Sequence, residues 1–191
     1  MAHCLPGTTV PADPDRLDGA EALLSPLFLA GGLTLSQVAQ LTGLEPHMIQ
    51  NWVRRGFVSP PQSKRYTRRQ FSRILLISML RGCMQLDKIC ALLSYVNGHL
   101  DDESDDLIDD WRLYGYAARL IVQARGEPLA GPEDRRSWCA GVLEDYQEPQ
   151  PGARARVERC LYIILTAWLA GQLKQEADQQ MTELERDLSN D

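Results

Sequence analysis

Gln50, Asn51 and Arg54 are the residues whose types and spacing best suit chemistry with another molecule. The amides of Gln50 and Asn51 each offer a donor beside an acceptor, which matches the edge of adenine, and the Arg54 guanidinium matches guanine or a phosphate. His47, about one helical turn earlier, can also hydrogen-bond to a base or a phosphate. Any surface helix is polar, so this pattern is also consistent with a solvated face that has no partner.

A basic stretch surrounds these residues. Between Pro46 and Leu86 the chain has eight basic and no acidic residues, although the whole chain holds 26 Asp and Glu against 20 Lys and Arg. Such segregation of charge suggests that one part of the chain meets a polyanion. A carboxylate here would repel phosphates, whereas each cation that neutralises a phosphate releases counterions and adds affinity. We interpret the stretch as a surface for double-stranded DNA, with a solvated basic face as the alternative.

Two short helices are predicted to position these side chains. Thr34 followed by Gln37 is a capping box, and Gly43 is typical of a left-handed residue that ends a helix. Pro46 suits the first position of the second helix, which Gly56 closes. Two short helices joined by a tight turn that contains glycine form a helix-turn-helix. The apolar residues expected to pack the pair are Val38, Leu41, Leu44, Ile49, Trp52 and Val53.

The next segment, FVSPPQSKRYT, predicts a small β-hairpin, or wing, because a β-prone start is followed by Pro-Pro and Ser. Thr67 with Gln70 is a second capping box and begins another helix. A further helix is predicted over roughly 86–96, before Asn97-Gly98. The wing and its flanks supply the other expected DNA-binding residues, namely Arg55, Lys64, Arg65, Tyr66, Arg68 and Arg69.

The residues from Leu33 to about Val122 resemble the DNA-binding domain of MerR-type bacterial regulators, on the pieces RRGFV and KRYTRRQ and the spacing between them. Where those regulators carry RYYE, this chain reads QNWV. The continuation YVNGHLDDESDDLIDDWRLYGYAARL is similar to a MerR-like family described as domain of unknown function 1836. The resemblance implies an all-α chain with a MerR-like winged helix-turn-helix, and a homodimer formed through a C-terminal helix.

Under this hypothesis the protein is a sequence-specific transcriptional regulator. Gln50, Asn51 and His47 would read the major groove, while the basic residues of the wing would hold the phosphate backbone. A dimer would place two recognition helices ~34 Å apart on a pseudo-palindromic site. The main alternative is a protein-interaction adaptor that keeps the helix-turn-helix shape, but such an adaptor would expose apolar residues on the face that is polar here.

The second half begins with seven carboxylates between Asp101 and Asp110. They lack the glycine and the terminal glutamate of an EF-hand calcium loop, so we expect Ser104 to cap a helix instead. Another helix is predicted over about 133–146, and a long helical stretch follows from Ala153. The predicted buried stripe of the first helix is Leu107, Ile108, Trp111, Tyr114, Ala118 and Val122.

The end of the long stretch carries apolar residues at a spacing suited to a coiled coil with a second copy or to packing on its own domain. Gly171 interrupts the run. The aromatic residues of this half are expected to be core, with a pocket for an unknown small-molecule effector as the alternative. Cys83 and Cys90 make a weak metal or redox sensor. The spaced apolar residues of the end are Ala177, Met181, Leu184 and Leu188.

Bulk properties complete the expectations. Five cysteines at scattered spacings indicate a reducing cytoplasm, and no long apolar run or secretory signal predicts a membrane role. No local enzyme motif is present, so we expect no catalytic residue, no metal and no cofactor. The expected organisation is a disordered leader over 1–18, a winged helix-turn-helix domain over 19–98, and a helical region for dimerisation or effector binding over 99–191.

Overall fold

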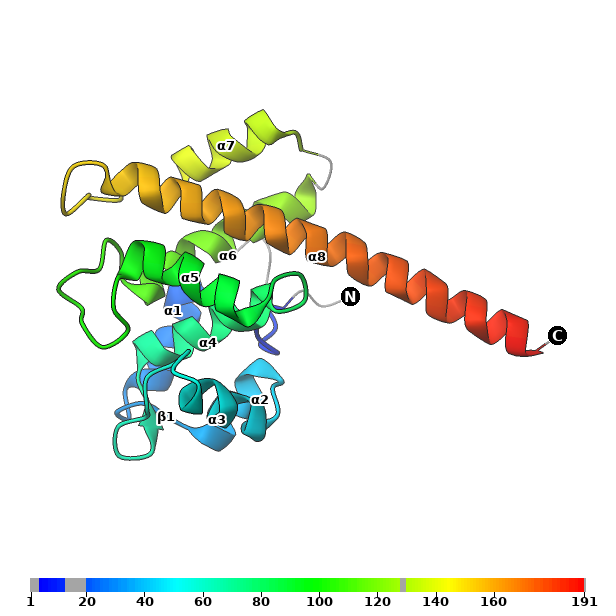
Figure 1. Cartoon of the computed structure of the whole chain (residues 1–191), viewed down its shortest axis with the longest axis horizontal. Coiled ribbons are helices and arrows are strands. Elements are labelled where there is room, and N and C mark those ends of the chain that lie inside the picture. Colours follow the sequence, from blue (N-terminus) through cyan, green and yellow to red (C-terminus); the bar gives the residue numbers. More distant parts are fainter. Residues whose placement is uncertain (1–3, 13–19, 128–129, 191) are drawn as a thin grey trace.

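The computed structural model describes residues 4–12, 20–127 and 130–190, and most of these residues are helical, as the predicted all-α class requires (Figure 1). Within these ranges no helix combines the length and the apolar character needed to span a bilayer. The elements run in the order α1 (Ala20–Leu24), η2 (Ser25–Phe28), β1 (Leu33–Thr34), α2 (Leu35–Thr42), α3 (Pro46–Arg54), β2 (Arg65–Tyr66), α4 (Arg68–Leu80), α5 (Leu86–Asn97), α6 (Asp110–Gly126), α7 (Pro132–Gly141) and α8 (Ala153–Asn190).

Local chemistry sets the ends of α2 and α3. The Thr34 hydroxyl accepts from the Gln37 backbone N–H at 3.3 Å, and the Gln37 side chain accepts from the Thr34 N–H at 2.9 Å. Gly43 has a φ of 68° and donates its N–H to the Ala39 carbonyl, which ends α2. Pro46 occupies the start of α3, where a missing N–H is not needed. The two predicted helices and the turn between them are confirmed.

The predicted wing differs in its pairing. Strand β2 pairs antiparallel with β1, which precedes α2, and a bridge between Gln62 and Arg65 closes a tight turn. The expected first strand at Phe57 is wrong: Phe57 is buried in the core, and its N–H bonds to the carbonyl of Trp52. Pro60 and Pro61 have no N–H to donate to a strand ladder. Within the predicted hairpin, the pairing is therefore limited to the bridge between Gln62 and Arg65.

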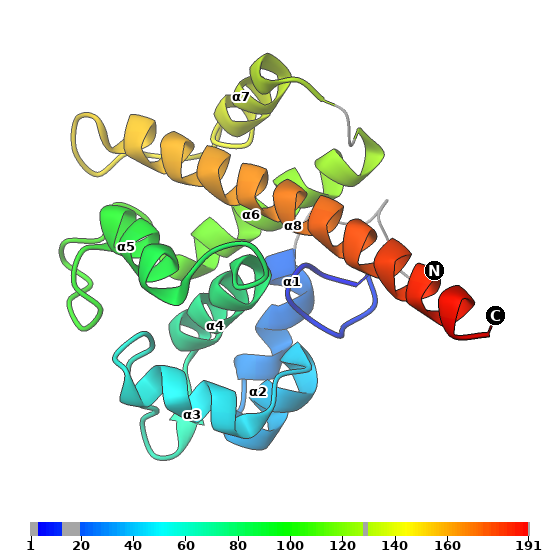
Figure 2. The same cartoon turned by 45° about the vertical axis from the view of Figure 1, so that its right-hand side comes forward.

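Helix α4 is the centre of the fold, with α2 and α3 on one side and α6 and α8 on the other (Figure 2). Most residues of α4 are buried, because it packs against α2, α5, α6 and α8. One hydrophobic cluster therefore includes buried residues from both halves of the chain. The buried apolar residues of α4 are Phe71, Ile74, Leu75, Leu76, Ile77 and Leu80.

Residues 4–12, which belong to the expected leader, contact two helices. Leu5 is buried, and the Tyr114 hydroxyl of α6 donates to the Pro6 carbonyl at 2.9 Å. The Thr9 hydroxyl also donates to the Gln40 carbonyl at the end of α2. The segment is held in place because Leu5 is buried in the core and because hydrogen bonds join Pro6 to α6 and Thr9 to α2. Residues 1–3 and 13–18 of the expected leader lie outside the described residues.

The start of α6 also differs from the prediction. Ser104 does not cap the helix, since its hydroxyl donates to the Asp102 carboxylate at 2.7 Å. The cap is Asp109, whose side chain accepts from the N–H groups of Trp111 and Arg112. Leu107 is buried as expected, although it precedes the helix. A carboxylate is a strong acceptor at a positive helix end, and the later position lets the acidic loop of residues 99–109 reach α4.

Helix α8 begins inside the fold and ends outside it. Its first half is buried at Val157, Leu161 and Ile164, whereas its second half projects away from the rest of the molecule (Figure 1). Gly171 does not interrupt the helix. The projecting half keeps large apolar side chains exposed, at Leu173, Met181, Leu184 and Leu188.

Candidate nucleic-acid interface

The outer face of α3 carries the side chains that the sequence predicts to read bases. Ile49 and Trp52 are buried on the inner face of the helix, so the opposite face is held toward solvent. On that face His47 and Gln50 are exposed and Asn51 is half-buried. The structure therefore brings the three predicted reading residues together on one short helix, because burial of its apolar stripe leaves no other orientation.

Arg54 orients the amide of Asn51. One guanidinium nitrogen of Arg54 donates to Asn51 Oδ1 at 3.1 Å. The amide oxygen of Asn51 is thus directed toward the guanidinium, and its NH2 group is the part that can donate to an acceptor such as adenine N7. The two residues act as a unit at the end of α3.

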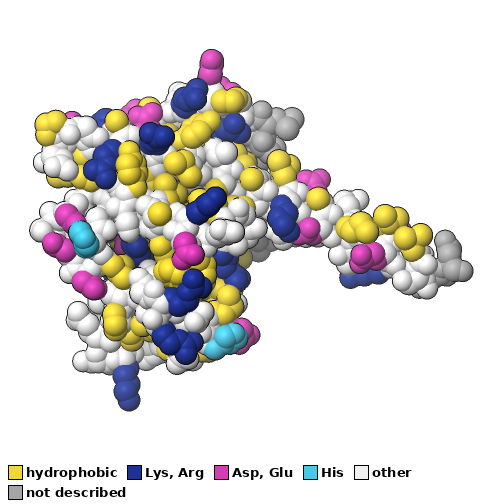
Figure 3. Space-filling model, in the orientation of Figure 1, with side chains coloured by type: hydrophobic (Ala, Val, Ile, Leu, Met, Phe, Trp, Pro, Cys, Tyr) yellow, Lys and Arg dark blue, Asp and Glu magenta, His cyan; other side chains and the backbone are white. Residues whose placement is uncertain are grey.

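Basic side chains lie beside this helix. Lys64 is exposed at the tip of the turn and has a φ of 62°. Arg65 donates to the Gly32 carbonyl at 2.9 Å, and the Arg68 guanidinium lies 5.3 Å from the Trp111 ring centre. Lys and Arg side chains project from the part of the surface formed by α3 and this turn (Figure 3). Arg55 pairs with Asp87 at 3.6 Å, and both side chains remain largely exposed.

Tyr66 was expected to bind DNA, but its side chain is not exposed on this surface, as a phosphate contact would require. Its side chain is only 3% exposed, and burial raises the pKa of its hydroxyl. In strand β2 successive side chains point to opposite faces, so Arg65 is directed outward and Tyr66 inward. Tyr66 is buried beneath this surface and does not form part of its polar face.

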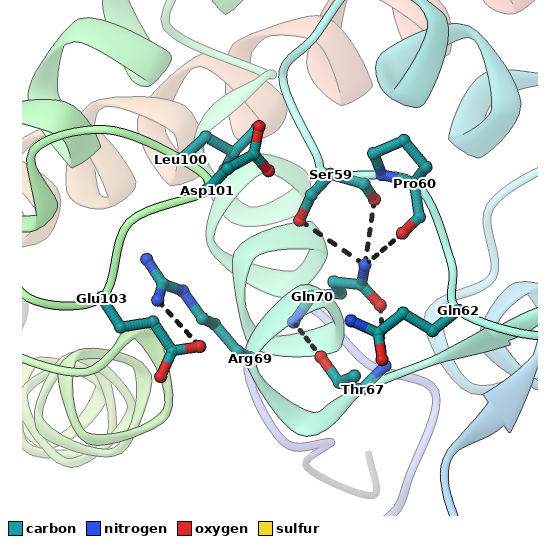
Figure 4. A pocket seen from close by; sticks show the side chains of 9 residues that line it. All are labelled: Ser59, Pro60, Gln62, Thr67, Arg69, Gln70, Leu100, Asp101 and Glu103. Carbon is teal, nitrogen blue, oxygen red and sulfur yellow. Dashed lines mark hydrogen bonds and ion pairs between the residues drawn. The ribbon is translucent and has the colours of Figure 1, made fainter.

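Arg69 is engaged by the acidic loop instead of being free for a ligand. Its guanidinium lies 3.1 Å from a carboxylate oxygen of Glu103 and 3.1 Å from one of Asp106. A third carboxylate, Asp110 at the start of α6, is 3.9 Å away. Figure 4 shows Arg69 paired with Glu103, and the Gln70 amide donating to the carbonyls of Ser59 and Pro60. These residues line a hollow of about 220 Å³.

A buried ion pair connects α4 to α6. Arg73 is 4% exposed, donates from Nε to the Phe57 carbonyl at 2.9 Å, and lies 3.6 Å from Asp110. The Asn97 amide donates to the other carboxylate oxygen of Asp110 at 2.6 Å. Burial raises the pKa of Asp110, while the guanidinium groups of Arg73 and Arg69 oppose that rise. The sequence signal for this network was an arginine within the apolar run RILLISML.

Asp106, a carboxylate of the acidic loop that pairs with Arg69, has a strongly raised pKa. Burial raises its pKa to about 7, against the opposing effect of Arg69 and with the help of Asp110, Asp105 and Glu103. Several carboxylates that share few guanidinium groups do not all ionise at once. The folded state therefore holds this proton more tightly than the unfolded chain, where the ordinary value is 3.8.

This shift predicts how stability changes with pH. Between pH 4 and pH 7 the wild type should lose stability relative to an Asp106→Asn variant, and above pH 7 the difference should stay constant. The reason is that only the unfolded aspartate ionises freely over that range. Urea unfolding of both proteins at pH 5, 6, 7 and 8 measures the difference. A difference that instead grows in favour of the wild type with rising pH would mean that Arg69 lowers this pKa.

Two alternatives from the sequence were an aromatic pocket for an effector and a sensor formed by Cys83 and Cys90. Tyr114 and Trp111 are buried in the core, so their rings serve packing. Burial raises the pKa of both the Cys83 and the Cys90 thiols. Over the described part of the chain, no three His, Cys, Asp or Glu side chains are grouped so that they could hold a metal ion.

The candidate surface lies within the part of the chain that matches a family model. Residues 32–116 match the model of a family described as a domain of unknown function, DUF1836. This range contains α2, α3, the turn with Lys64, and both partners of the Arg73–Asp110 pair. The predicted similarity to this family is thus confirmed over these residues. No curated protein and no solved structure matches the chain.

Proposed function

We propose that this protein is a sequence-specific DNA-binding transcriptional regulator of MerR-like type that acts as a dimer. The observation that carries the proposal is the outer face of α3, where His47, Gln50, Asn51 and Arg54 lie together beside the basic turn that contains Lys64. The major groove of DNA admits one α-helix, and these side chains match the donors and acceptors that base pairs present there.

The charges around α3 support a polyanionic partner. Lys64 in the turn, Arg65 in β2 and Arg68 at the start of α4 are all exposed basic residues. With α3 in the major groove, the exposed turn is positioned to contact the sugar-phosphate backbone. Phosphate contacts set the register, whereas base contacts select the sequence. The polar character of the α3 face also favours DNA over the adaptor alternative, since a protein-docking helix buries apolar anchors.

Salt dependence tests the proposal directly. Fluorescence anisotropy with labelled duplexes of mixed sequence, at 50 and 200 mM salt, measures the affinity. If four phosphates are contacted, the affinity should fall on the order of 10²-fold over this range, because each contact releases counterions. Binding that is absent, or insensitive to salt, would contradict DNA binding and favour the adaptor.

Two substitutions separate the roles on the proposed surface. Lys64→Gln should weaken binding to all duplexes several-fold and lower the salt slope by about 1, because one phosphate contact is lost. Asn51→Ala should change the sequences selected from random DNA, since the Asn51 NH2 group would no longer donate to a base edge.

The matched control is Arg159→Gln, which removes one positive charge from an exposed position on α8, away from α3 (Figure 1). Its affinity and selected sequences should equal those of the wild type. Equal losses for Lys64→Gln and Arg159→Gln would show that only net charge matters. Unchanged selection by Asn51→Ala would remove α3 from base reading.

A further inference from the structure

An apolar hollow opens on the same surface as the predicted reading residues. It has a volume of about 360 Å³ and lies between the start of α2, the outer side of α3 and the turn. Its lining is mostly apolar, with polar side chains from Gln50 of α3 and Lys64 of the turn. The six residues that line it are Leu35, Gln50, Val53, Pro61, Lys64 and Tyr66.

The composition of this hollow restricts what fits it. Val53 and Leu35 are only half-buried, so part of their apolar surface stays in contact with water. None of the six lining side chains is acidic, and Lys64 adds a positive charge to the lining. A suitable occupant therefore combines a small apolar group with a neighbouring anion, and it offers a hydrogen-bonding edge within reach of Gln50.

We propose that the hollow receives the 5-methyl group of a thymine, so that Val53, Leu35 and Pro61 contribute to sequence selection; this inference rests on the proposed DNA binding. The thymine methyl is the apolar group that unmodified base pairs present in the major groove. Gln50 matches adenine bidentately, which places an A·T pair beside the hollow. The phosphate that follows such a base is the anion for Lys64.

The size of the effect follows from the area that the methyl group loses to water. Burying one methyl-sized group between Val53 and Leu35 should improve affinity about four-fold. Removing that methyl from the DNA leaves all donors, acceptors and phosphates unchanged. The contribution of the hollow can therefore be measured separately from base hydrogen bonding and from charge.

Deoxyuridine scanning tests the inference. Duplexes selected from random DNA by the full-length wild type are resynthesised with each thymine replaced in turn by deoxyuridine. We expect one thymine in each half-site whose replacement lowers the affinity about four-fold. In Val53→Ala this thymine-to-uracil ratio should fall toward one, because the wall of the hollow is lost.

Val122→Ala is the matched control, since Val122 is also half-buried but lies on α6. It should keep the wild-type ratio. If no duplex is selected and salt-dependent binding is absent, the proposed function itself fails. If duplexes are selected but every deoxyuridine replacement is neutral, or if Val53→Ala keeps the full ratio, only the thymine inference is overturned. The wild-type scan does not depend on the folding of any variant.

Discussion

Replacing Asp110 with alanine is expected to destabilise the protein by about 3–5 kcal/mol, because the change leaves a buried guanidinium without its counterion. Asp110 is fully buried at the start of α6, where it faces Arg73 at 3.6 Å and accepts from Asn97 at 2.6 Å. Arg73 cannot turn to water, since it is 4% exposed and its Nε is bonded to the Phe57 carbonyl. The unpaired charge would therefore remain inside the core.

Equilibrium unfolding in urea, followed by circular dichroism at pH 7, measures this loss. Asp87→Ala is the control, because it also removes an ion pair, that with Arg55, but between exposed side chains. Such a pair contributes about 0–1 kcal/mol. The double variant Asp110→Leu with Arg73→Met should recover most of the loss, since an apolar pair leaves no charge buried. If Asp110→Ala costs no more than Asp87→Ala, the pair does not join α4 to α6 as described.

Introducing charge on the projecting half of α8 is expected to separate the proposed dimer and to weaken binding to a palindromic site on the order of 10²-fold or more. Met181, Leu184 and Leu188 follow the three- and four-residue spacing of a coiled-coil seam, and their side chains are 52%, 50% and 68% exposed. A second copy would cover this stripe. The double variant Leu184→Glu with Leu188→Glu would place like charges against one another there.

Light scattering gives the mass of each protein in solution, and anisotropy gives its affinity for full sites and for half-sites. The variant should be a monomer with reduced affinity for the full site and unchanged affinity for the half-site, because each α3 is intact. Gln179→Glu, on the same part of α8 but off the seam, should remain dimeric. A wild type that is itself monomeric at the concentrations used for DNA binding would rule out this role of α8.

Short-range chemistry allowed much of this fold to be predicted from the sequence. The capping boxes at Thr34 and Thr67, and the left-handed residue Gly43, involve groups only a few positions apart. Such contacts do not depend on the rest of the chain. The polar face of α3 was predictable for a similar reason, since Ile49 and Trp52 determine which side of a short helix is buried.

Contacts between distant segments determined the rest. Tyr66 turns inward because β2 pairs with a strand more than thirty residues earlier in the chain. Arg69 and Arg73 are basic residues of the same stretch as Lys64, yet carboxylates of the loop and of α6 neutralise them only after folding. Charge counted along the sequence therefore overstates the cations available to a ligand. The amino-acid sequence by itself determined the helices and their polar face, and the tertiary structure decided which charges stay free, because ion pairing depends on distance in space.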